Sequence, residues 1–148
     1  MIYGIGLFLA IILIALAVFD LRELRLPDVL TLPLILAGLG QAALLGLGVT
    51  NALIGAAAGY AAFVLIELTY RRLRGQDGLG RGDAKLLAAG GAWCGWSGLP
   101  LIVLISSALA LIALLFPSFK TIADRGEIPF GPFLALAIAI VWASLQIA

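Results

Sequence analysis

The sequence predicts an all-α protein that crosses a membrane about six times, with both chain ends on the outer side. Of the 148 residues, 64% are hydrophobic and only 11% are charged, whereas a soluble domain is about half apolar and roughly a quarter charged. The chain divides into apolar runs near 2–19, 29–47, 51–69, 84–97, 99–116 and 132–147. Because a membrane-spanning helix needs roughly 20 apolar residues, we expect a single transmembrane domain over residues 1–148.

The first three runs have the length of a span or nearly so. The run at 2–19 is not preceded by the positive charge of a signal peptide, so we interpret it as a retained span. The third run contains Gly55 and Gly59, and this spacing of small residues allows two helices to approach closely. The second and third runs are therefore expected to be packed membrane helices.

The fourth run is short, and the fifth follows almost at once. One interpretation merges 84–116 into a single long buried segment. Gly98 and Pro100 instead favour a turn between two helices. Trp93 and Trp96 suit the outer interfacial layer of a membrane. The last run, 132–147, follows a Pro-Phe-Gly-Pro stretch and completes the six.

The charged residues lie in three groups, and these groups predict the topology. With six spans, all three groups fall on one side of the membrane, whereas the other connections and both termini carry no side-chain charge. Short basic loops stay in the cytoplasm, so the charged side is predicted to be cytosolic. The groups are Asp20, Arg22, Glu23, Arg25 and Asp28; Glu67, Arg71, Arg72, Arg74, Asp77, Arg81, Asp83 and Lys85; and Lys120, Asp124, Arg125 and Glu127.

Two acids lie at the ends of apolar runs, where a carboxylate is energetically costly and therefore suggests a function. Asp20 ends the first run and Asp83 precedes the fourth. Position alone allows a structural explanation for each: Asp20 as an interfacial charge paired with a nearby arginine, and Asp83 as a helix N-cap. A cap does not require Gly80 and Gly82, which permit positive φ angles and close backbone approach.

Two carboxylates on one side of a membrane also fit an aspartyl protease dyad. Neighbouring acids share a proton because they cannot both ionise easily. The ionised acid activates a water, and the protonated acid polarises the scissile carbonyl and protonates the leaving amine. This chemistry needs no metal, cofactor, histidine or thiol, which suits a chain with no histidine and one cysteine, Cys94. The basic residues form no stripe, so no nucleic-acid partner is expected.

Three stretches carry a resemblance to a known family. Residues 20–33 read DLRELRLPDVLTLP, residues 80–87 read GRGDAKLL and continue into GAWCGW at 91–96, and residues 128–133 read IPFGPF. In this order they resemble the first-aspartate, GxGDxKL and IPFGP motifs of the type IV prepilin peptidases, which are GxGD membrane aspartyl proteases. The resemblance covers essentially the whole chain.

The resemblance implies roles for particular residues. Asp20 and Asp83 would be the catalytic pair, and the substrates would be prepilins or pseudopilins whose basic leader is cut at the cytosolic face of the inner membrane. Three residues would shape the Asp83 loop: Gly80, Gly82 and Lys85. Two acids are candidate contacts for the basic leader: Glu67, with pairing to Arg71 as the alternative, and Asp28, otherwise the N-cap of the second span. The structural motif residues are Pro27, Pro129, Phe130, Gly131 and Pro132.

The chain also departs from the long family members. It shows no room before the first span, and no paired cysteines, for their N-terminal domain, which is linked to N-methylation. It therefore resembles the short, peptidase-only members. Three other functions stay open: a small proton-coupled carrier, a non-catalytic assembly subunit, and a protease that cuts within membrane spans. Carriers usually place ionisable groups near mid-membrane between repeated halves.

Overall fold

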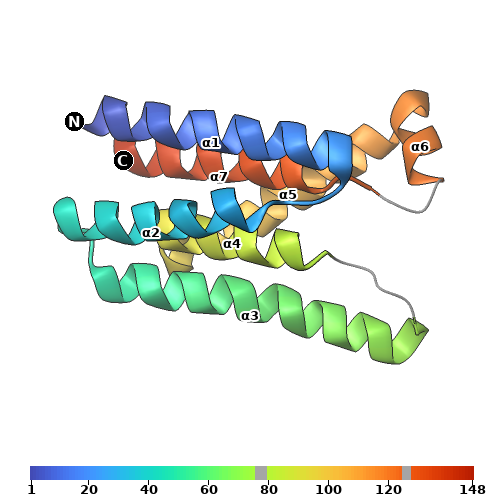
Figure 1. Cartoon of the computed structure of the whole chain (residues 1–148), viewed down its shortest axis with the longest axis horizontal. Helices are drawn as coiled ribbons and strands as arrows, with labels where there is room; N and C mark the ends of the chain where they lie inside the picture. Colours follow the sequence, from blue (N-terminus) through green and yellow to red (C-terminus); the bar gives the residue numbers. More distant parts are fainter. Residues whose placement is uncertain (76–79, 125–127) are drawn as a thin grey trace.

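The computed structural model describes residues 1–75, 80–124 and 128–148, and these residues form an all-helical bundle (Figure 1). No strand is found in the described ranges. In chain order the elements are α1 (Ile2–Glu23), α2 (Asp28–Leu44), α3 (Val49–Arg74), α4 (Arg81–Cys94), the 3-10 helix η1 (Trp96–Gly98), α5 (Leu99–Leu114), α6 (Pro117–Ala123) and α7 (Gly131–Ile147).

The helices follow the predicted apolar runs closely. The turn between the fourth and fifth runs is confirmed, because α4 ends at Cys94, Gly95 adopts φ +72°, and α5 begins at Leu99 with Pro100 in its first turn. The short helix α6 was not predicted. Three described segments are long and apolar enough to cross a membrane, namely α1, α3 and Trp96–Leu114, while α2 and α7 are shorter apolar helices. Six crossings therefore remain a prediction.

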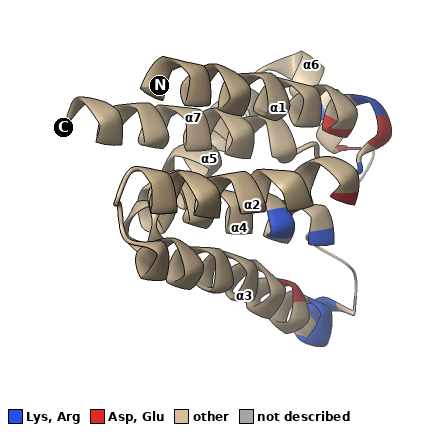
Figure 2. Ribbon diagram, turned by 60° about the vertical axis from the view of Figure 1, so that its left-hand side comes forward, with Lys and Arg blue, Asp and Glu red and all other residues tan. Residues whose placement is uncertain are grey.

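The two ends of the bundle differ in charge. Both chain termini lie at one end (Figure 1). Figure 2 shows the described charged residues gathered at the opposite end. We call these the neutral end and the charged end. This arrangement agrees with the predicted separation of charged and uncharged loops, and which end faces the cytosol remains a prediction.

Helix α4 is the central helix of the bundle and packs against α2, α3 and α7. Its contact with α3 is the most extensive, and the close approach predicted from the small-residue spacing is confirmed there. A Cβ atom on Gly55 would overlap the carbonyl oxygen of Gly91, and one on Gly59 would lie 2.7 Å from that of Leu87. The two backbones therefore touch, and this contact holds α4 in place along α3.

A buried hydrogen-bond network ties the neutral end together. Gln41 Nε2 donates to the carbonyl oxygen of Trp93 at 3.0 Å, and Trp142 Nε1 donates to Gln41 Oε1 at 3.1 Å. The Trp93 indole donates to the carbonyl oxygen of Leu34 at 2.8 Å. Trp93 is buried, so its predicted interfacial position is wrong. It packs edge-on against Trp142 inside the bundle.

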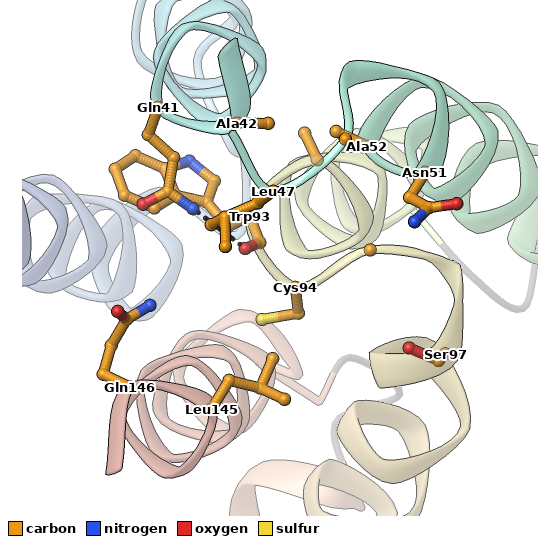
Figure 3. Close-up of a pocket in the computed structure, with 13 residues that line it drawn as sticks. Gln41, Ala42, Leu47, Asn51, Ala52, Trp93, Cys94, Ser97, Leu145 and Gln146 are labelled. Atoms are coloured by element: carbon orange, nitrogen blue, oxygen red, sulfur yellow. Dashed lines mark hydrogen bonds between the residues drawn. The ribbon is translucent and has the colours of Figure 1, made fainter. Parts of the chain in front are cut away.

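A pocket of about 240 Å³ opens beside this network. Figure 3 shows Gln41, Trp93 and Cys94 at its wall, with Asn51 and Ser97 also lining it. None of the described residues that line it is charged. The pocket therefore lies apart from both candidate acids, and its described wall offers no carboxylate that could act on a water.

Candidate active site

Asp20 lies in the last turn of α1 and is buried. The chain leaves this helix through Leu24, which adopts a left-handed conformation (φ 52°) and donates its backbone N–H to the carbonyl oxygen of Asp20 at 2.9 Å. The Asp20 carboxylate accepts a hydrogen bond from the backbone N–H of Gly131 at 2.8 Å. Asp20 is therefore held at the charged end by both its backbone and its side chain.

The IPFGP stretch forms the other side of the Asp20 site. Gly131 is the first residue of α7, where backbone N–H groups have no partner within their own helix. A Cβ atom on Gly131 would lie 2.6 Å from Asp20 Oδ2, so only glycine allows the carboxylate to come this close. Phe130 packs against Phe63 of α3 with ring centroids 6.3 Å apart, and Pro132 occupies the first turn of α7.

Asp83 lies in the first turn of α4, before the apolar run that starts at residue 84. The N-cap is Gly80, and among the described residues no side-chain cap bond is found at this helix start, so the N-cap prediction for Asp83 is wrong. The pKa of the Asp83 carboxyl is raised to about 7, first by burial and second by the charge of Asp20. Although the two acids are far apart in sequence, they therefore lie within electrostatic reach of each other.

The glycines before Asp83 do not use the full backbone freedom of glycine, because neither Gly80 nor Gly82 adopts the positive φ angle that this residue permits. Close approach is confirmed for Gly82, where a Cβ atom would lie 2.9 Å from the Cβ of Leu26. Leu26 is buried and precedes Pro27. The first-aspartate motif and the GxGD motif therefore touch in the folded chain.

Lys85 connects α4 to α2. Its Nζ atom lies 2.5 Å from Asp28 Oδ1. Asp28 is the first residue of α2 behind the N-cap Pro27, with no side-chain cap, so the N-cap prediction for Asp28 is wrong. The acid serves as the partner of a lysine two residues beyond Asp83.

Glu67 is buried in α3, on the face that also carries Gly59 and Phe63. Its predicted pairing with Arg71 is confirmed, with Nη2 and Oε1 3.8 Å apart. A second contact was not predicted: Arg81 Nε lies 3.9 Å from Glu67 Oε2. The candidate leader-binding acids Glu67 and Asp28 thus both have basic partners on α4.

Sequence reasoning missed two contacts that build this site. It treated Gly131 as part of a structural motif, whereas its N–H binds Asp20. It also gave Arg81 no role, although its contact with Glu67 joins the GxGD turn to α3. The position of Gly131 directly before Pro132 at a helix start was a usable signal, since a helix N-terminus attracts carboxylates. Three residues of the predicted charged groups, Asp77, Arg125 and Glu127, lie outside the described residues.

Comparison of the sequence with known proteins gives a family match. Residues 7–115 match the type IV leader peptidase family. The prepilin leader peptidase/N-methyltransferase of Aeromonas hydrophila is 42% identical over 141 residues, which cover 93% of this chain and 49% of that protein. The proteins of the same name from Dickeya chrysanthemi and Pseudomonas aeruginosa are 44% and 40% identical over 135 residues each, covering 87% and 88% of this chain and 46% of either relative.

The chain spans about half the length of these curated relatives. No solved structure matches it.

Proposed function

The chain belongs to the type IV leader peptidase family, and from this premise we propose that it is a membrane aspartyl endopeptidase with Asp20 and Asp83 as its catalytic dyad. The observation that carries the proposal is the meeting of three distant motifs at one end of the bundle. Gly131 donates to Asp20, Leu26 packs on Gly82, and the charge of Asp20 raises the pKa of Asp83.

Asp20 and Asp83 have different surroundings, and this difference supports different catalytic roles for the two acids. The Asp20 carboxylate is buried, which opposes its charged form, but it accepts the N–H of Gly131, and such a bond favours that form. Burial and the charge of Asp20 favour the protonated form of Asp83. Asp20 then takes a proton from the attacking water, and Asp83 polarises the scissile carbonyl and protonates the leaving amine. The pair titrates as a unit, so the two roles are exchanged as the shared proton moves.

The substrates that we propose are prepilin or pseudopilin precursors, and the proposal is supported by relatives that are named prepilin leader peptidases. The precursor would lie in the bilayer with its basic leader at the charged end of the bundle. Short basic loops stay in the cytoplasm, so cleavage would occur at the cytosolic face of the inner membrane. The chemistry requires water and the two carboxyl groups alone.

The test is cleavage of a co-expressed pilin precursor, read as a size shift on a gel. Asp20→Asn and Asp83→Asn remove the general base and acid, and each should lower the rate of processing by about 10²- to 10⁴-fold. Asp124→Asn is the matched control, because Asp124 is an exposed acid after α6. It should process at the wild-type rate.

Membrane insertion of each variant is verified by fractionation and detergent extraction. Near wild-type processing by either dyad variant contradicts the proposed mechanism. A wild-type chain that inserts but never processes a precursor would instead support a non-catalytic assembly role.

A further inference from the structure

The two basic residues on either side of Asp83 each contact an acid on a different helix. Arg81 lies two positions before Asp83 and reaches Glu67 on α3, with 3.9 Å between Nε and Oε2. Lys85 lies two positions after it and reaches Asp28 on α2, with 2.5 Å between Nζ and Oδ1. The first turn of α4 is therefore linked to both of its neighbours, on either side of a catalytic acid.

Helix geometry explains why these two ion pairs leave the Asp83 side chain free to face Asp20. Residues four apart share one side of a helix, whereas residues two apart do not face each other. Arg81 and Lys85 thus point to the side of α4 that meets α2 and α3, with which α4 packs. Asp83 points away from both, and its interaction with the charge of Asp20 agrees with this direction.

Glu67 and Asp28, the acids in these pairs, are poorly placed to bind a basic leader peptide. Glu67 is buried at the end of the α3 face that packs on α4, and a buried carboxylate requires partners of opposite charge. The contacts with Arg71 and Arg81 supply them. Asp28 is more exposed, but the Lys85 ammonium already occupies it. An exposed pair of this kind contributes little to stability, so its main effect is on orientation.

We infer that Glu67 and Asp28 are positioning residues that act through Arg81 and Lys85. Together the two pairs hold the first turn of α4 against α3 and α2 and fix the orientation of the Asp83 carboxyl relative to Asp20. Neither acid touches the substrate. The inference rests on the proposed dyad, and it replaces the predicted binding of the leader by these two acids.

The experiment is a charge swap across the Asp28–Lys85 pair. Asp28→Lys, Lys85→Asp and the double variant are purified, and kcat and KM are measured with a synthetic precursor that has a basic leader and an apolar segment. Each single reversal should lower kcat about tenfold while KM changes less than about twofold, because a misplaced catalytic group slows the chemical step. The double variant should recover to within about threefold of wild type, since coupled residues are not additive.

The second pair is tested on its exposed member. Arg81→Gln should lower kcat about fivefold with little change in KM, and Arg81→Lys should retain most of the rate. Arg72→Gln is the matched control, because Arg72 is an exposed arginine at the charged end of α3. This variant should match wild type. Testing Arg81 avoids the risk that replacing buried Glu67 prevents folding.

Three outcomes overturn the inference. A rise in KM with unchanged kcat in Asp28→Lys would show that Asp28 binds the leader. Additive losses in the double variant would show that the pair is not coupled. Unchanged kcat in all variants would show that the pairs do not position Asp83. None of these three outcomes contradicts the proposed catalytic dyad if the Asp83→Asn variant is inactive. An active Asp83→Asn variant would contradict the dyad itself.

Discussion

The two ends of the bundle each contain buried polar side chains, but they use them differently. At the neutral end, Gln41 bonds to the carbonyl oxygen of Trp93 and to the Trp142 indole, and the described pocket wall beside them carries no charge. At the charged end, Asp20 is buried with one backbone donor, and its charge acts on Asp83. One end completes its hydrogen bonds internally, and the other brings two like charges together.

This difference separates a structural polar group from a functional one. A fully satisfied network specifies how helices pack. Two acids in reach of each other oppose folding, because each raises the free energy of the other's charged form. Perturbed carboxylates of this kind concentrate at functional sites. Changes at the charged end should therefore alter catalysis, and changes at the neutral end should alter stability.

Among the variants that distinguish the two ends of the bundle, Gly131→Ala is expected to have the largest effect on kcat. The new Cβ atom would lie 2.6 Å from Asp20 Oδ2, so the carboxylate must move away from its backbone donor. A displacement of about 1 Å can reduce a rate by about 100-fold, and we expect a loss of that order in kcat with the precursor substrate. Gly4→Ala is the control, since a Cβ atom at that position would meet no packing neighbour within 4 Å.

A glycine-to-alanine substitution at the neutral end tests whether the two ends differ in their effect on catalysis. A Cβ atom on Gly38 would lie 2.7 Å from the Trp93 ring, so Gly38→Ala should lower the melting temperature in detergent and leave kcat of the folded enzyme unchanged. If Gly38→Ala reduces kcat as much as Gly131→Ala does, the two ends are not functionally distinct.

The pH dependence gives a smaller effect that belongs to the charged end alone. The pKa of Asp83 is raised to about 7, so below that pH the proposed dyad would keep the proton that the leaving amine requires. As pH rises through about 7 the proton is lost, and kcat should fall about tenfold per pH unit above it. The measurement is a rate profile between about pH 5 and 9 in proteoliposomes. A rate that keeps rising with pH over this range would contradict the assignment.

The smallest effect on activity is expected from Gln41→Leu. This change leaves the Trp142 N–H and the Trp93 carbonyl without partners, and each unsatisfied buried group lowers the free energy of unfolding by about 1–3 kcal/mol. Thermal unfolding should shift downward, whereas the rate and pH profile of the folded enzyme should match wild type. Gln146→Leu, which lines the same pocket, should change neither. A shifted pH profile in Gln41→Leu would link the two ends.

Much of the fold could be predicted because it depends on local patterns. The apolar runs predicted the helices, and Gly98 with Pro100 predicted the turn before α5. The spacing of Gly55 and Gly59 predicted close packing but not its partner, which is α4. Trp93 was misplaced because an aromatic residue near a helix end is equally compatible with the interface and with the core. Its buried position follows from Gln41 and Leu34, which are distant in sequence.

The sequence by itself determined the helical membrane character, the grouping of charges and the identity of the two candidate acids, since hydropathy, charge and short motifs can be read from neighbouring residues. Only the tertiary structure decided what surrounds those acids. The bond from Gly131 to Asp20 joins positions 111 residues apart, and the pairs of Arg81 and Lys85 depend on how α4 lies between α2 and α3. Such contacts arise from helix packing, which no local pattern specifies.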